Sequence, residues 1–207
     1  MHGRNRRRRA PSRRFPAQGD QGQVAGRNEL PRDRLHRSVR AVGQLAGLGA
    51  NFDAFADEES FVLGAFLFED VGVSAYAGAA KRVASDMKLA DAAGILAVEA
   101  YHAGIIRAQI GEMGPATIEK ANAISRARDT LDGPENAETV TEPGRIHISN
   151  TDAQGRAFPR RVGEVLNQVY GAPGGGVNHG GFFPRGVNGV VRRTVRDKPP
   201  LTPGAGA

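Results

Sequence analysis

Phe61-Val-Leu-Gly-Ala-Phe-Leu-Phe-Glu69-Asp-Val-Gly-Val-Ser-Ala-Tyr76 is followed by a second apolar stretch, Ala92-Ala-Gly-Ile-Leu-Ala-Val-Glu99-Ala-Tyr-His102-Ala-Gly-Ile-Ile106. Both stretches are long enough for several helical turns, and each carries ionisable residues inside the apolar run. In the second stretch Ala92, Ile95, Glu99, His102 and Ile106 are spaced by three and four residues, which predicts that they share one helical face. A carboxylate buried in such a face is costly unless it is paired or binds a metal.

The spacing between the two stretches predicts a helical hairpin. Glu69 and Glu99 are 30 residues apart, and Ala84 lies at their midpoint. Ser85 or Asp86 can act as the N-cap of the second helix there. If the chain turns back at that point, each glutamate lies roughly 22 Å from the turn, at about 1.5 Å per residue. We therefore expect the two glutamates to meet at the same level of an antiparallel pair.

The residue types in this hairpin suggest a metal site. Glu-x-x-His places two ligands one helical turn apart, as in the helices of carboxylate-bridged di-metal bundles. The candidate metal ligands are Glu69, Glu99 and His102, and two carboxylates with one imidazole suit iron, manganese or zinc better than copper(I). Two plainer interpretations stay open: Glu99 and His102 hydrogen-bond to each other in a core, or Glu69 pairs with an arginine. No catalytic residue and no organic cofactor site is assigned.

Charge is distributed unevenly along the 207 residues. Residues 1–40 carry twelve arginines against three acidic residues, a net charge of +9, whereas the whole chain carries +6. The remainder is therefore mildly acidic. Clustered arginines predict weak, salt-sensitive, non-specific affinity for nucleic-acid phosphates. The chain has no cysteine, so it forms no disulfide and offers no thiolate ligand.

Targeting and membrane signals are weak. Ser12-Arg13-Arg14-Phe15 has the charge pattern of a twin-arginine signal, but residues 16–40 are polar and offer no apolar segment to follow it. We therefore expect no signal peptide in this chain, and the compartment stays open. The most apolar window, residues 61–80, is interrupted at its centre by Glu69 and Asp70, so we expect no membrane span.

The rest of the chain predicts an all-α domain between two tails. We expect disorder in the arginine-rich residues 1–30, a helical domain over residues 31–192, and a disordered tail over residues 193–207. The expected helices cover residues 30–48, 57–84, 87–113, 115–131 and 161–170, with an irregular loop over residues 132–159. Within the domain, Phe52 and Phe55 are expected to dock on the helices. In the glycine-rich segment 171–189, Phe182 and Phe183 are expected to plug a groove.

Four motifs together resemble a known family. They are Phe-Leu-Phe-Glu-Asp-Val-Gly-Val-Ser-Ala-Tyr (66–76), Ala-Gly-Ile-Leu-Ala-Val-Glu-Ala-Tyr-His-Ala-Gly (93–104), Ala-Arg-Asp-Thr-Leu-Asp-Gly (127–133) and Gly-Gly-Phe-Phe-Pro-Arg-Gly-Val-Asn-Gly (180–189). Their order and spacing are similar to those of the ferritin-like domain family that includes plant desiccation-related proteins and bacterial relatives, some of them exported. The resemblance covers residues 45–192.

The resemblance implies a ferritin-type four-helix bundle with a di-metal site. Glu69 would be the lone glutamate of the third bundle helix, and Glu99 and His102 would be the Glu-x-x-His of the fourth. Tyr76 and Tyr101 are close enough in sequence to lie behind the ligands, although core packing is the favoured role for both. The implied metal is iron or manganese, held by half a site.

The chain departs from this pattern at its N-terminal end. The bundle's other Glu and Glu-x-x-His should lie upstream, where the nearest imitation is Asp33-Arg-Leu-His36 after Glu29, among arginines that would repel a cation. We therefore expect residues 1–40 to derive from another reading frame, a wrong start or a truncated gene. The predicted fold is an incomplete ferritin-like helical bundle, made of a C-terminal helix hairpin plus extra helices.

Two functions follow from this prediction. The first is a ferritin-like, desiccation- or stress-related protein with the remnant half of a carboxylate di-metal site. The second is a non-catalytic structural or interaction module that has lost metal binding. In either case, half a bundle leaves apolar helix faces uncovered, which predicts self-association.

Overall fold

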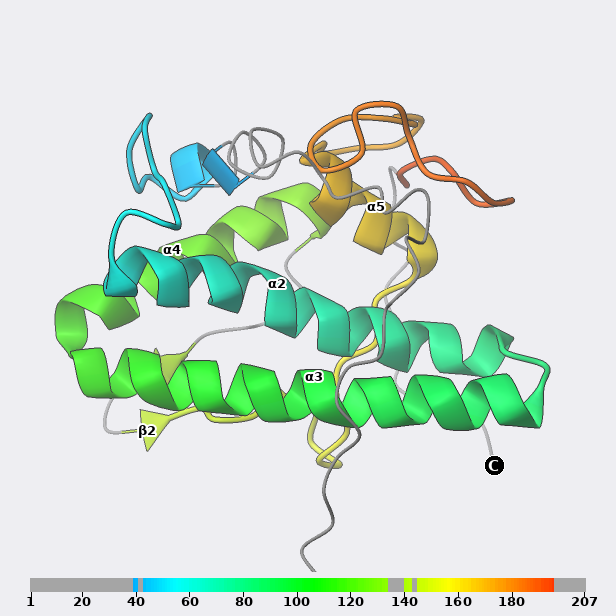
Figure 1. Cartoon of the computed structure of the whole chain (residues 1–207), viewed down its shortest axis with the longest axis horizontal. Coiled ribbons are helices and arrows are strands. Elements are labelled where there is room, and N and C mark those ends of the chain that lie inside the picture. The colour runs from blue at the N-terminus through cyan, green and yellow to red at the C-terminus, as the bar shows by residue number, and fades with distance from the viewer. Residues whose placement is uncertain (1–38, 41–42, 134–139, 143–144, 196–207) are drawn as a thin grey trace, which may run out of the picture. The chain divides into compact units, whose positions relative to one another are not determined.

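The computed structural model describes residues 39–40, 43–133, 140–142 and 145–195, all within the compact unit of residues 31–207. The elements in chain order are α2 (Glu58–Ala79), the short 3-10 helix η1 (Ala80–Arg82), α3 (Asp86–Met113), α4 (Pro115–Asp132), β1 (Thr141–Glu142), β2 (Arg145–Ile146) and α5 (Val162–Tyr170). Residues 39–40 and 43–45 are helical as well. The prediction of an all-α fold is confirmed for the described residues, apart from the two-residue strands β1 and β2 (Figure 1).

Helices α2 and α3 form the expected antiparallel hairpin and run side by side (Figure 1). Each begins at a side-chain cap: Asp57 Oδ1 accepts a hydrogen bond of 2.7 Å from the Ser60 backbone N–H, and Ser85 Oγ accepts one of 3.5 Å from that of Lys88. Such caps satisfy backbone donors that the first helical turn leaves free. The two helices are therefore positioned by signals that are local in the sequence.

Helix α4 begins where the glycine and proline predict. Gly114 has φ +97°, a conformation that residues with a Cβ rarely adopt, and it ends α3. Pro115 then occupies the first turn of α4, where its missing N–H costs nothing.

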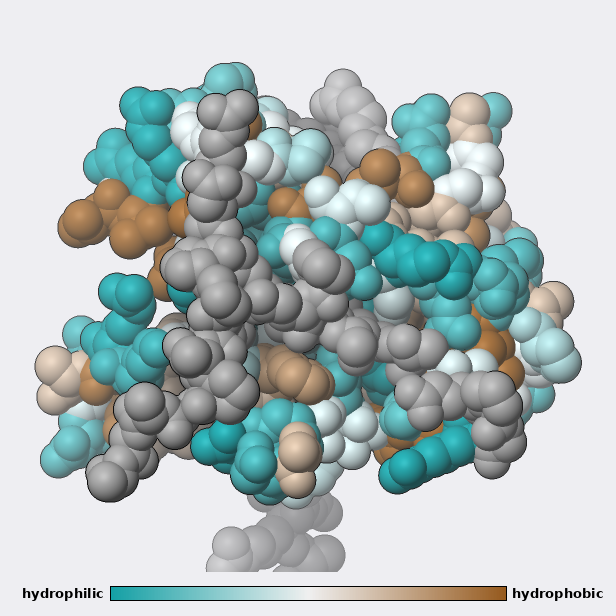
Figure 2. Space-filling model, turned by 180° about the vertical axis from the view of Figure 1, so that it is seen from behind, coloured by the Kyte–Doolittle hydropathy of each residue, from teal (hydrophilic) through white to brown (hydrophobic). Residues whose placement is uncertain are grey.

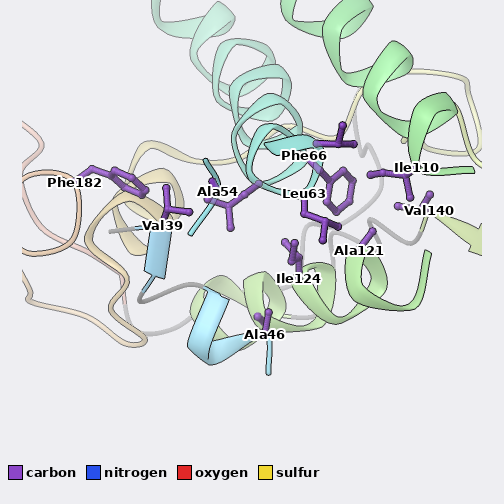
Figure 3. Close-up of a cluster of buried hydrophobic side chains, with 13 residues drawn as sticks. Val39, Ala46, Ala54, Leu63, Phe66, Ile110, Ala121, Ile124, Val140 and Phe182 are labelled. Carbon is purple, nitrogen blue, oxygen red and sulfur yellow. The ribbon is translucent and has the colours of Figure 1, made fainter. Parts of the chain in front are cut away.

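The core lies where α2, α3 and α4 meet. In Figure 3, Leu63 and Phe66 of α2 point toward Ile110 of α3 and toward Ala121 and Ile124 of α4. All five side chains are buried. Phe182 belongs to the same cluster and packs against Phe68 with ring centroids 5.0 Å apart, so this half of the expected aromatic plug is confirmed.

Several details differ from expectation. Phe52 packs against the core, but Phe55 and Phe183 are exposed. The Phe55 ring lies instead beside the exposed Phe61 ring, with the centroids 6.4 Å apart and the ring planes tilted by 58°. The expected irregular loop contains a short antiparallel ladder, with Thr141 opposite Ile146. At the C-terminal side, Thr194 is buried and its backbone N–H donates to the Val177 carbonyl at 2.8 Å, so ordered structure extends past residue 192.

The packed face of α3 is not the face that the spacing predicted. Leu96, Glu99 and Ala103 are partly or fully buried, whereas Ile95 and His102 are exposed. Alanines and isoleucines surround this helix on nearly every side, so periodicity alone did not identify the buried side. Tyr101 is 72% exposed, which shows that the expected core role for this residue was wrong.

By length and composition, two stretches are apolar enough to cross a membrane, Glu58–Arg82 and Asp86–Met113. Half of the apolar window in the first stretch is buried inside the protein, and the core helix of a soluble protein passes the same test. The absence of a membrane span therefore stays a prediction. On the face shown in Figure 2, hydrophobic residues reach the surface in several places among hydrophilic ones.

Candidate metal centre and the ion pairs beside it

The structure brings Glu69 of α2 close to Glu99 and His102 of α3. His102 Nδ1 lies 3.3 Å from Glu69 Oε2. The Glu99 carboxylate lies against Gly72, one turn beyond Glu69 on α2, where a Cβ would collide with Glu99 Oε2. The two glutamates therefore lie close together on the antiparallel hairpin, as their equal distance from the turn predicts.

In this group two carboxyl groups, those of Glu69 and Glu99, lie near a single basic side chain, that of His102. Burial raises the pKa of Glu99 above its ordinary value, the negative charge of Glu69 raises it further, and His102 lowers it. Glu69 Oε2 is buried, and among the described residues it has no hydrogen-bond partner. A carboxylate oxygen in this state gains from either a proton or a cation.

The side chains of Glu69, Glu99 and His102 carry donor atoms that suit a metal ion, but they are not arranged as a group of ligands around one. Two carboxylates and one imidazole are donors that a hard or borderline divalent cation accepts. However, within the part of the chain that the structure describes, no group of three or more His, Cys, Asp or Glu side chains is placed to hold an ion. His102 is 55% exposed, so its ring has room to turn.

Asp70, the neighbour of Glu69, is the centre of a buried ion-pair network that the sequence interpretation missed. Arg107 Nε and Nη2 donate to Asp70 Oδ1 and Oδ2 at 3.1 and 2.7 Å, and Arg128 Nη2 donates to Oδ2 at 3.2 Å. Arg128 also donates to the Phe66 carbonyl at 3.0 Å, and both guanidinium groups lie over the Phe66 ring, with the Arg107 and Arg128 Cζ atoms 5.3 and 4.5 Å from its centroid. One aspartate therefore connects α2, α3 and α4.

A second buried ion pair, between Arg160 and Asp132, connects the segment before α5 to the end of α4, and Arg160 also hydrogen-bonds to Ser74 of α2. Arg160 Nε donates to Asp132 Oδ2 and Arg160 Nη1 to Ser74 Oγ, both at 2.6 Å. The Arg160 backbone N–H also donates to the Ser74 carbonyl at 2.9 Å. A cavity of about 220 Å³ has Asp70, Ser74 and Arg107 in its wall, together with Ile148 and Phe158 of the segment before α5.

A sequence signal for the first network was present. Asp70 and Ser74 continue the spacing of Leu63, Phe66 and Leu67 along α2, and Arg128 continues the spacing of Ile118, Ala121 and Ile124 along α4. An acid and a base in two facing apolar stripes indicate a buried pair. The arginine partner that was considered for Glu69 belongs instead to Asp70.

Comparisons with known proteins agree with this architecture. Residues 22–112 match the sequence model of the ferritin-like domain. The chain is also 31% identical, over 138 residues, to the desiccation-related protein PCC13-62 of Craterostigma plantagineum, an alignment that covers 58% of this chain and 44% of the relative. The chain thus spans less than half the length of the curated relative it matches. No solved structure matches it.

Proposed function

We propose that the chain is a ferritin-like protein of the desiccation-stress class, because residues 22–112 match the ferritin-like domain model and because its relative is named a desiccation-related protein. We further propose that Glu69, Glu99 and His102 are the remnant half of a carboxylate di-metal site that binds a divalent cation weakly. The stress role rests on the relative's name, and the metal role rests on the local geometry.

The observation that carries the metal proposal is the buried Glu69 Oε2. It lies 3.3 Å from His102 Nδ1, lacks a hydrogen bond within the described part of the chain, and belongs to the carboxylate that raises the pKa of Glu99. A cation beside it would neutralise two carboxylates at once. Three protein donors leave several positions on the ion to water, which makes binding weak.

Calorimetric titration with ferrous or manganous ion under anaerobic conditions tests this proposal. The expected result is measurable binding by the wild type and no binding by Glu99→Gln, which removes one anionic donor but keeps the side-chain shape. Glu112→Gln, on the exposed surface of the same helix, is the matched control and should bind like the wild type. Binding releases a proton from the carboxyl pair, so affinity should rise with pH.

The second candidate is a structural or interaction module without metal. It is favoured by the absence, among the described residues, of a group of side chains already placed to hold an ion. On this alternative the titration shows no heat in either protein. Glu99→Gln then leaves the stability unchanged or raises it, because a partly buried acid becomes neutral. The stress-class assignment survives that outcome, since it does not rest on the metal.

A further inference from the structure

The glycine-rich segment that follows α5 contains a loop that is closed at its base. The buried Tyr170, the last residue of α5, holds both ends: its hydroxyl accepts a hydrogen bond of 3.2 Å from the Val187 backbone N–H and donates one of 3.2 Å to the Arg192 carbonyl. Arg192 Nε also donates to the Gly189 carbonyl within the loop. We call residues 187–192, at the orange-to-red end of the chain in Figure 1, the valine loop. Its base is fixed to a helix, so its tip has a defined place on the surface.

The tip of the valine loop combines apolar and cationic side chains. Val190 is 101% exposed and Val191 is 46% exposed, so both valines face solvent. They line one open hollow together with Arg192 and Arg193. Each of these arginines donates a hydrogen bond to a backbone carbonyl of its own segment. A guanidinium group has five N–H donors, so both arginines retain donors for an anionic partner.

The charge of the chain changes sign where this segment begins. Residues 41–170 carry eleven basic and eighteen acidic residues, a net charge of −7 with histidine counted as neutral. Residues 171–207 carry five basic residues against Asp197, a net charge of +4, and the charged residues between positions 171 and 195 are all arginines. An anionic surface therefore attracts the segment that holds the valine loop and repels the helices before it.

We propose that the valine loop docks on the surface of an anionic lipid bilayer. Val190 and Val191 enter the boundary between the head groups and the acyl chains, and Arg192 and Arg193 bind lipid phosphates at the level of the head groups. Apolar side chains gain by leaving water at this boundary, and each arginine near an anionic bilayer contributes about 1 kcal/mol of attraction. The docking is peripheral and needs no membrane-spanning segment.

A bilayer surface fits this tip better than a nucleic acid or a partner protein does. Nucleic acid offers phosphates to the two arginines, but its backbone offers no apolar partner to Val190. A stable protein interface buries about 1,000 Å² or more, which a loop of six residues does not supply by itself. A bilayer places phosphates and apolar chains next to each other, as the loop places its arginines and valines.

Tryptophan fluorescence of the full chain tests the docking, because the chain has no tryptophan of its own. In Val190→Trp the new indole reports on the tip of the loop. In Val98→Trp, the matched control, it reports on a valine of α3 that is 49% exposed. With vesicles of phosphatidylcholine and phosphatidylglycerol we expect the emission of Val190→Trp to shift to shorter wavelength and that of Val98→Trp to stay unchanged. Vesicles of phosphatidylcholine alone should shift neither, since they carry no net negative charge to attract the arginines.

Vesicle flotation measures what the native valines contribute. The arginine-rich residues 1–40, with a net charge of +9, can attract the full chain to the same vesicles, so the variants must leave every charge in place. The double variant Val190→Asn, Val191→Asn does so and removes only the apolar tip. We expect its partition coefficient to be about tenfold lower than that of the wild type, because two side chains no longer gain by leaving water. Val98→Asn is the control and should float like the wild type.

Four results would overturn the proposal. Unchanged emission of Val190→Trp with the anionic vesicles, even when the protein floats with them, assigns the binding to the N-terminal arginines. Equal shifts of Val190→Trp and Val98→Trp indicate adsorption without a preferred surface. A shift of Val190→Trp with phosphatidylcholine alone shows that the arginines take no part. A shift with a DNA duplex but not with vesicles assigns the loop to nucleic acid.

Discussion

Asp70 and Glu69 are adjacent residues with opposite electrostatic surroundings. Asp70 is buried and receives hydrogen bonds from two arginines, whereas Glu69 lies beside a second carboxyl group and a half-exposed histidine. One step along a helix rotates a side chain by about 100°. Here that rotation places Asp70 in the core and Glu69 beside His102 of α3. The two acids therefore have different roles, Asp70 in stability and Glu69 in the candidate site.

Replacement of Asp70 by Asn should destabilise the protein by about 3–5 kcal/mol, because two buried guanidinium groups lose their counter-charge. Urea denaturation at neutral pH measures the change. Glu69→Gln is the neighbouring control, and we expect it to change the free energy of unfolding by less than about 1 kcal/mol, since its nearest cationic partner is a half-exposed histidine. An Asp70→Asn variant as stable as Glu69→Gln would show that the network does not hold the core together.

The raised pKa of Glu99 has a consequence for the pH dependence of stability. Unfolding returns the group to its ordinary value of 4.5. Between that value and the higher pKa of the folded state, the folded protein binds more protons than the unfolded chain, so stability falls as the pH rises through this window. Removal of the acid in Glu99→Gln should abolish this loss.

Urea denaturation between pH 4 and pH 8, without added metal, measures this effect. The stability of Glu99→Gln relative to the wild type should increase with pH through the window and level off above it. An unchanged difference across the whole range would mean that Glu99 titrates in the folded protein as it does in the unfolded chain.

At the scale of elements, small residues on α2 allow close approach by its neighbours. Gly64 leaves room for Ala54, Gly72 leaves room for the Glu99 carboxylate, and a Cβ at Gly78 would collide with the backbone carbonyl of Arg160. A flexible side chain can move away from such a Cβ, but a backbone carbonyl moves only with its segment. Gly78 is therefore the glycine that fixes how the segment before α5 lies on α2.

The variant Gly78→Ala should lose about 3 kcal/mol of stability, because the Arg160 segment must move and strain its ion pair with Asp132. Thermal unfolding followed by circular dichroism measures the loss. Gly104→Ala, in the interior of α3, is the control: its Cβ would lie 3.6 Å from the Ile148 side chain, an ordinary contact. That control should gain helix propensity and be at least as stable as the wild type. Equal stability of the two variants would contradict the close packing at Gly78.

At the scale of the whole molecule, the predicted self-association has a consequence for stability. If the folded chain associates with itself, as its exposed apolar side chains predict, the midpoint temperature of unfolding must rise with protein concentration, because mass action favours the folded oligomer. Differential scanning calorimetry over a hundredfold range of concentration measures this rise. A midpoint that does not change with concentration would contradict the predicted self-association.

The arginine-rich start of the chain gives a separate prediction for the intact protein. Residues 1–21 hold seven arginines and one aspartate. We expect weak binding to double-stranded DNA that falls steeply with salt and does not depend on sequence. Deletion of residues 1–21 should abolish it. The deletion stops there because residues 22–112 match the ferritin-like domain and Val39 is part of the core. Fluorescence anisotropy at 50 and 200 mM salt measures the binding, and unchanged affinity after deletion would assign it elsewhere.

Some predictions lie outside the part of the chain that the structure describes. They concern the expected disorder of residues 1–30, most of the tail over residues 193–207, and the segment around Asp33 and His36. They stay predictions. The family match begins at residue 22, however, so the resemblance to a ferritin-like domain reaches further toward the N-terminus than the motifs alone indicated.

The sequence by itself determined the helical hairpin, its caps and the meeting of Glu69 with Glu99 and His102. These features depend on local sequence signals and on the number of residues between each glutamate and the turn. Neither of these depends on which helix face is buried. Only the tertiary structure decided which acid is buried, which arginines pair with it and which side of α3 stays uncovered. Those choices depend on contacts between residues such as Asp70 and Arg107, 37 positions apart, and on a helix that is apolar nearly all round, where periodicity cannot distinguish the sides.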